Sequence, residues 1–193
     1  MVDQNTTRRV EKALLDTIYW NAAHVPQTTP AGASDEHEFS DALTRKLDSL
    51  FTERPIWSKR AIQSQLPKRF HTALRYNLPK VCYLWGNGPW KDGYTKLGED
   101  PRSDPKYRYY QTLTFQLPNK RDYNEEGEAD SNWHIFDGRR IHSSTRLLQL
   151  CDITDPLMQK LLNEEAVRDE PDVSSEKSIL IWRFNMGGTG LLQ

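Results

Sequence analysis

The chain has 193 residues, of which 36% are hydrophobic and 27% are charged, and this size and composition predict one principal domain rather than two large ones. It contains neither a run of about 18 apolar residues nor a secretory signal, so we expect a soluble protein that makes no contact with a membrane. The formal net charge of −1 hides a strong segregation, because residues 1–53, 54–121 and 122–193 carry balances of −4, +10 and −7.

The N-terminal segment contains two helix signals separated by a linker. Val10, Leu14 and Ile18 recur at four-residue spacing, which predicts a first helix that ends before the turn-rich residues 26–34. Ser34 is suited to cap a second helix, because its side chain can accept a hydrogen bond from the first helical turn. The apolar stripe of this second helix consists of Phe39, Leu43, Leu47 and Leu50.

The positively charged middle segment predicts a helix-turn-helix followed by a sheet. Residues 55–57 are typical of a short strand, Ser58 is suited to cap the next helix, and a third helix follows and closes at Pro79. Residues 81–85 and 109–115 are rich in β-branched and aromatic residues, which predicts two strands that flank a long loop. We therefore predict an α+β fold, a winged helix with a small antiparallel sheet and with additional N- and C-terminal elements packed on it.

After residue 121 the chain becomes acidic. Residues 147–162 are apolar enough to form a helix and residues 178–184 predict a strand, with an acidic stretch between them. We expect this region to cover an apolar face of the winged helix, to lie over the basic segment and compete there with phosphate, or to do both. The predicted divisions are an N-terminal helix and linker at 1–34, the winged helix at 35–121 and the acidic C-terminal region at 122–193.

Basic side chains of the middle segment lie where a winged helix would contact DNA. In helical projection Lys68, Thr72 and Arg75 fall opposite the apolar stripe of the third helix, although an ordinary solvated face is the alternative interpretation. In the loop 86–108, basic residues alternate with aromatic ones, which suits phosphate contact and stacking. The predicted DNA-binding residues are Lys59, Arg60, Lys68, Arg69, His71, Thr72, Arg75, Tyr76, Lys91, Lys96, Arg102 and Lys106.

Signatures of other functions are weak. The glycine clusters at 86–88 and 187–190 lack the features of a phosphate-binding loop and predict turns. The five histidines and two cysteines show no metal-binding spacing, so we expect no metal, no cofactor, no small-molecule substrate and no catalysis. We expect Trp85 and Trp90 to be core residues that cover the sheet.

Three stretches of the sequence resemble the fifth subunit of transcription factor IIIC, the assembly factor for RNA polymerase III. They are LFTERPIWSKRAIQSQL from Leu50, YLWGNGPWKDGYTKLGEDPRSDPKYRYYQTLTFQ from Tyr83, and LQLCDITDPLMQKLL from Leu148. The Glu-Arg-Pro-Ile-Trp entry, the Gly-Pro-Trp turn, and Asp-Pro-Arg leading to Tyr-Gln-Thr are unusual combinations. The resemblance is strong over residues 38–117 and weaker over 145–162.

The resemblance implies a nuclear subunit that helps to recognise the A box of internal promoters, as in transfer RNA genes. Its implied partners are double-stranded DNA and the other subunits of the factor. It also implies that the chain corresponds to a C-terminal portion, because full-length members carry an N-terminal region that pairs with a partner subunit. Two functions stay open: a DNA-binding module that mainly contacts backbone phosphates, and a winged-helix protein-interaction module within the same complex.

Overall fold

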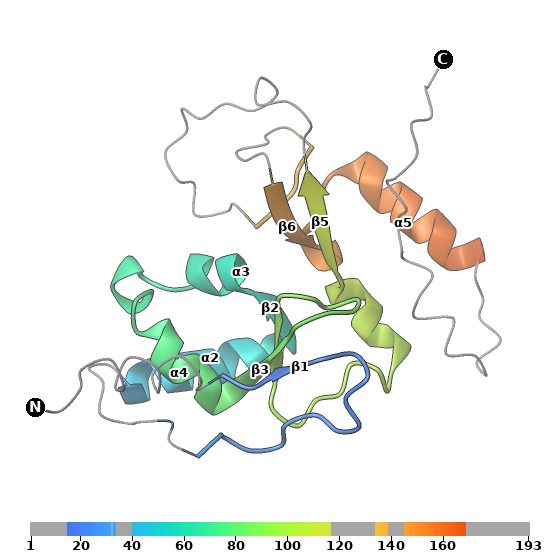
Figure 1. Cartoon of the computed structure of the whole chain (residues 1–193). Coiled ribbons are helices and arrows are strands. Elements are labelled where there is room, and N and C mark those ends of the chain that lie inside the picture. Colours follow the sequence, from blue (N-terminus) through green and yellow to red (C-terminus); the bar gives the residue numbers. More distant parts are fainter. Residues whose placement is uncertain (1–14, 32, 34–39, 117–133, 139–144, 169–193) are drawn as a thin grey trace, which may run out of the picture.

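The computed structural model describes residues 15–31, 33, 40–116, 134–138 and 145–168, which form the predicted α+β winged helix with further elements packed on it (Figure 1). Within these residues no helix is both long and apolar enough to cross a bilayer. The strands are β1 (Thr17–Ile18), β2 (Ile56–Ser58), β3 (Cys82–Trp85), β4 (Gly93–Lys96), β5 (Thr112–Gln116) and β6 (Thr145–Gln149). The α-helices are α2 (Ser40–Glu53), α3 (Lys59–Ser64), α4 (Leu74–Val81) and α5 (Pro156–Arg168). Three short 3₁₀ helices lie between them: η1 (Lys68–Phe70), η2 (Pro105–Tyr110) and η4 (Leu150–Asp152).

The first two helices of the middle of the fold, α2 and α3, form where the local sequence signals predict them. Leu43, Leu47 and Leu50 of the predicted stripe are buried and pack against α3 and α4 in one apolar cluster. Ser34 and Phe39 lie outside the described residues. Ser58 caps α3, because its hydroxyl oxygen accepts a hydrogen bond from the Ala61 amide over 3.2 Å. The four strands of the adjoining sheet lie in the order β1-β3-β4-β2, with β1 parallel to β3 and the other neighbours antiparallel.

The last strand of the wing is β4, and the prediction that residues 109–115 supply it is wrong. β4 pairs with both β3 and β2. Gly93 begins β4 where the chain turns back so tightly that a Cβ atom would lie 2.7 Å from the carbonyl oxygen of Trp90. The glycine, lysine and aspartate around it have a low strand propensity and therefore predict a loop, but hydrogen bonding on both edges outweighs that propensity.

The strand predicted at 109–115 is confirmed over residues 112–115 by β5, whereas residues 109–110 belong to η2. The helix predicted at 147–162 is confirmed only from residue 156 onwards, because residues 147–152 belong to β6 and η4. β5 pairs with β6 in a separate antiparallel sheet, with Leu113 opposite Leu148. The chain then passes through η4, and α5 begins at Pro156. The short apolar run at 147–149 is compatible with either a strand or a helix, and it forms a strand because it pairs with β5. Proline is well suited to the first helical position, since no hydrogen bond is lost there.

The predicted first helix is a strand in its described part, because Ile18 belongs to β1. This strand is part of residues 15–31, which we call the N-terminal arm. β1 lies along the outer edge of β3, where the Gly86 amide donates to the carbonyl oxygen of Ile18 over 2.8 Å. This pairing satisfies an otherwise open sheet edge and outweighs the helical spacing. Val10 and Leu14 lie outside the described residues.

The predicted third helix is interrupted. η1 is followed by turns at residues 71–73, and only then does α4 begin. Pro79 lies inside α4 rather than at its end; it lacks the amide that would bond to the preceding turn, and burial of its ring offsets part of that loss. Lys68, Thr72 and Arg75 consequently do not share one continuous helix.

Several predictions concern residues that the structure does not describe. The strand at 178–184 and the acidic residues at 122–133 and 169–176 are among them. The divisions at residues 34 and 121 stay predictions. β1, which precedes residue 34, and β6, which follows residue 121, both contact the winged helix.

Candidate nucleic-acid interface

The turn between α3 and α4 is held by side chains that face inward. The His71 Nε2 atom lies 2.9 Å from the carbonyl oxygen of Gln63 and 3.2 Å from that of Leu66, at the end of α3. Asn77 is fully buried; it donates to the Ala73 carbonyl over 2.9 Å, and its Oδ1 accepts from the Thr44 hydroxyl of α2 over 3.1 Å. These contacts fix the angle of α4. They also make His71, a predicted DNA-binding residue, part of the turn itself.

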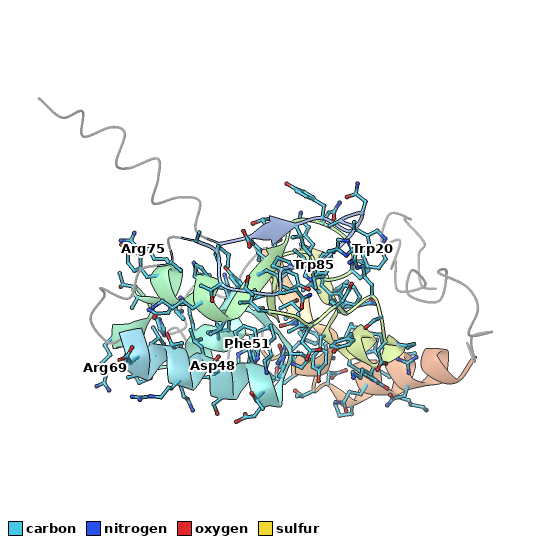
Figure 2. The ribbon with its side chains drawn as sticks, turned by 90° about the horizontal axis from the view of Figure 1, so that it is seen from below. Trp20, Asp48, Phe51, Arg69, Arg75 and Trp85 are labelled. Carbon is cyan, nitrogen blue, oxygen red and sulfur yellow. The ribbon has the colours of Figure 1, made fainter. Side chains whose placement is uncertain are left out.

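The remaining predicted residues of the helix-turn-helix are largely exposed. Lys59 and Arg60 open α3, and Lys68 and Arg69 lie on η1. Thr72 and Arg75 are exposed beside the start of α4, whereas Tyr76 is half-buried. In Figure 2 the side chains of Arg69 and Arg75 lie at one end of the molecule, away from Trp20 and Trp85. We define the basic surface as the exposed cations Lys59, Arg60, Lys68, Arg69 and Arg75.

Residues predicted from the long loop have different environments. Lys91 is exposed in the turn between β3 and β4, and Lys96 is half-buried on β4. The ammonium of Lys106 lies 3.1 Å from Asp104 Oδ2. Hydrogen bonds from the backbone and side chain of Lys106 lower the pKa of the Asp104 carboxyl. Lys91 and Lys96 thus belong to the wing and Lys106 to η2, rather than to the helix-turn-helix that carries the basic surface.

Arg102, another predicted DNA-binding residue, is engaged in the fold. Its guanidinium lies 2.7 Å from the Asp100 carboxylate and donates to the carbonyl oxygens of Trp20 and Ala22 over 3.0 and 2.5 Å. The hydrogen bond lowers the pKa of the Asp100 carboxyl and raises that of Arg102. Because these bonds tie the N-terminal arm to the chain after β4, we leave Arg102 out of the proposed interface.

The N-terminal arm also covers the turn of the wing, residues 86–92. The Trp20 amide donates to Asn87 Oδ1 over 2.6 Å. The Trp20 ring packs 5.7 Å from that of Trp90 and 6.4 Å from that of Trp85, centroid to centroid, so the aromatic side chains of the loop form a second apolar cluster. Trp85 and Trp90 are at most 1% exposed, which confirms that they are core residues.

Sequence analysis missed the role of Arg54. Its guanidinium forms a bidentate pair with Asp152 at 2.6 and 2.8 Å and donates to Gln149 Oε1 over 2.7 Å. This cluster attaches η4 and β6 to the end of α2. The unusual Glu-Arg-Pro-Ile-Trp sequence marked the position, but no local signal identifies partners more than 90 residues away. Among the described residues, no group of three or more His, Cys, Asp or Glu side chains could hold a metal ion.

Replacing Arg102 with alanine is expected to lower the free energy of unfolding by about 1–3 kcal/mol, since the partly buried carbonyl oxygens of Trp20 and Ala22 lose a charged donor. Urea denaturation followed by tryptophan fluorescence would measure the loss.

Because the pKa of the Asp100 carboxyl is lowered in the folded state, the stability that this carboxylate contributes is present at neutral pH and is lost as the pH falls below the ordinary value of 3.8. The difference between variant and parent should therefore shrink in acid. Lys106→Ala, which removes an exposed pair, is the control, and an equal loss there would contradict this assignment.

Comparison with known proteins gives consistent matches. A family model described as "Tau95: RNA polymerase III transcription factor (TF)IIIC subunit HTH domain" matches residues 2–116. The chain is 38% identical over 124 residues to "Transcription factor tau subunit sfc1" of Schizosaccharomyces pombe, which covers 64% of this chain and 26% of that protein. It is 36% identical over 92 residues to "Transcription factor tau 95 kDa subunit" of Saccharomyces cerevisiae, covering 46% of this chain and 14% of that protein.

A solved structure titled "Sfc1-DBD" has the same fold, with a TM-score of 0.68 and 30% sequence identity. The likeness covers 78% of this chain and 72% of that one. By contrast, the matched region spans about a quarter or less of the length of these curated relatives.

Proposed function

The chain belongs to the Tau95 family of RNA polymerase III transcription factor IIIC subunits, and on this premise we propose that it is a DNA-binding module of such a subunit. The observation that carries the proposal is the basic surface on the helix-turn-helix, with five exposed cations on α3, η1 and the first turn of α4. The solved structure that shares the fold is named as a DNA-binding domain, which supports the same interpretation. The matched relatives are named as transcription factor subunits rather than enzymes.

We further propose that the target is duplex DNA of internal A-box promoters, contacted mainly at backbone phosphates. In a helix-turn-helix, the first helix crosses the DNA backbone and the second enters the major groove. Lys59 and Arg60 at the start of α3, with Lys68 and Arg69 on η1, are therefore suited to meet phosphates. A nuclear location and association with other subunits of the factor follow from the same proposal.

A protein-interaction module is the second candidate, and one observation favours it. Helix α5 carries two exposed leucines, Leu157 at 67% and Leu161 at 48%, on one side of the helix. In Figure 1, α5 lies on the other side of the molecule from α3 and α4. A contact with another subunit through α5 would thus leave the basic surface accessible, and the two functions are compatible.

Fluorescence anisotropy of a labelled duplex, titrated at several salt concentrations, tests the DNA-binding function. We expect a nonspecific dissociation constant between roughly 0.1 mM and 1 µM, weakening with salt by a log-log slope of about −0.9 for each phosphate neutralised. This steep slope arises because each contact releases condensed counterions. Absence of binding at low salt would leave protein interaction as the function.

A further inference from the structure

The outward face of α4 offers few side chains that could reach a base edge. The buried side chains of α4 are Leu74, Asn77, Leu78, Pro79 and Val81. The only amide side chain of the helix, Asn77, is already bonded to Ala73 and Thr44, so it is not available to recognise adenine. Arg75, Tyr76 and Lys80 remain.

Position separates these three residues. The N-terminal residues of the second helix contact base edges when a helix-turn-helix docks in the major groove. Arg75 is the second residue of α4, whereas Lys80 lies in its last turn. Tyr76 is half-buried, and its hydroxyl accepts a hydrogen bond from Arg75. Arg75 is therefore the charged donor at the end of α4 that enters a groove first.

The Arg75 side chain is held in place before any DNA is bound. Its guanidinium carbon lies 4.4 Å from the centroid of the Tyr76 ring, and Nη2 donates to the Tyr76 hydroxyl. A guanidinium has five N–H donors in a planar fork, so this bond leaves donors for a second acceptor. Stacking on a half-buried ring restricts the rotamers of Arg75 and reduces the entropy lost when a base is bound.

We infer that Arg75, stacked on Tyr76, recognises guanine by hydrogen bonding to the major-groove edge of that base, and that it sets the base preference of α4. Guanine presents two acceptors there, O6 and N7, and an arginine fork bonds both at once, whereas a lysine acts as a point charge. The phosphate contacts, which do not depend on the base sequence, come from Lys59, Arg60, Lys68 and Arg69. The inference rests on the proposed DNA-binding function and adds a specificity determinant to it.

The test selects binding sites from a random duplex library with the parent protein and with Arg75→Lys, which keeps the charge. Parent sites should share a guanine that the variant no longer selects. Replacing that guanine with 7-deazaguanine, which lacks the N7 acceptor, should weaken binding by the parent roughly tenfold and leave the variant unaffected. The salt slope of Arg75→Lys should equal that of the parent, because its charge is retained.

Three further variants separate base recognition by Arg75 from its positioning by Tyr76 and from phosphate contact by Lys68. Tyr76→Ala should reduce the guanine preference while Arg75 is intact, and Tyr76→Phe, which keeps the ring, should restore most of it. Lys68→Gln should weaken binding to all duplexes alike and reduce the slope by about one. Identical selected sites for parent and Arg75→Lys would overturn the inference while leaving DNA binding intact. Failure of the parent to bind any duplex would overturn both.

Discussion

Asp152→Ala is expected to lower the free energy of unfolding by about 3–5 kcal/mol, because it leaves the charge of Arg54 buried without its counterion. The side chains of Arg54 and Asp152 are only 14% and 8% exposed. Water can therefore replace little of the lost interaction. The pair also joins residues 98 positions apart, so its loss loosens the attachment of η4 to the winged helix.

The environment of Arg54 explains why the effect should exceed that of an ordinary ion pair. Its Nε donates to the Ile56 carbonyl over 2.9 Å, and its guanidinium carbon lies 4.6 Å from the centroid of the Trp57 ring. Gln149 joins the cluster by accepting from Arg54 and donating to the Tyr110 carbonyl over 2.9 Å. The cluster thus joins the end of α2 to η4, β6 and the last residue of η2.

Urea denaturation followed by circular dichroism measures this loss. Asp48→Ala is a matched control, because Asp48 is an exposed carboxylate on α2 (Figure 2), the helix that ends one residue before Arg54. Its removal should change stability by less than about 0.5 kcal/mol. The double variant Arg54→Met with Asp152→Leu should recover part of the stability, since no charge is left buried. Equal unfolding midpoints for Asp152→Ala and the parent would contradict the proposal that the Arg54–Asp152 pair attaches η4 to the winged helix.

Elements with strong local signals could be predicted from the sequence. Ser58 lies before a helix and can act only through the adjacent amides, so the position of its cap follows from its neighbours. The leucine stripe of α2 likewise needs only its spacing. β4 and β6 could not be predicted in this way, because the partner strand rather than the local composition decides their structure.

Residues of the candidate site likewise differ in whether local sequence or tertiary contacts decide their role. The sequence places Arg69 and Arg102 in one basic segment, yet Arg69 is exposed on η1 whereas Arg102 bonds to the N-terminal arm some 80 residues earlier. Both are arginines of the same positively charged segment, and only tertiary contacts distinguish them. The stacking of Arg75 on Tyr76 is a local contact, but its significance depends on where α4 begins, and the sequence does not reveal the interruption at residues 71–73 that sets this start.

Simultaneous replacement of Lys59, Arg60, Lys68 and Arg69 by glutamine is expected to weaken duplex binding at least a hundredfold at about 50 mM salt. Removing one phosphate contact lowers the magnitude of the log-log salt slope by about 0.9, so the slope should fall by roughly three to four if all four residues contact DNA. The curves of variant and parent should converge towards about 1 M salt, where counterion release contributes little. All four side chains are exposed, and the thermal transition should therefore be retained.

The control for this variant removes the same amount of charge elsewhere. Arg45 and Lys46 are exposed on α2, and Lys91 and Lys106 are exposed on the wing turn and η2. Their replacement by glutamine changes the net charge equally, so any effect of overall charge on the approach of DNA is the same in both proteins. A loss of affinity confined to the first variant locates the duplex on the helix-turn-helix. Equal losses in the two variants would mean that binding follows net charge alone, and a larger loss in the control would move the interface to the wing.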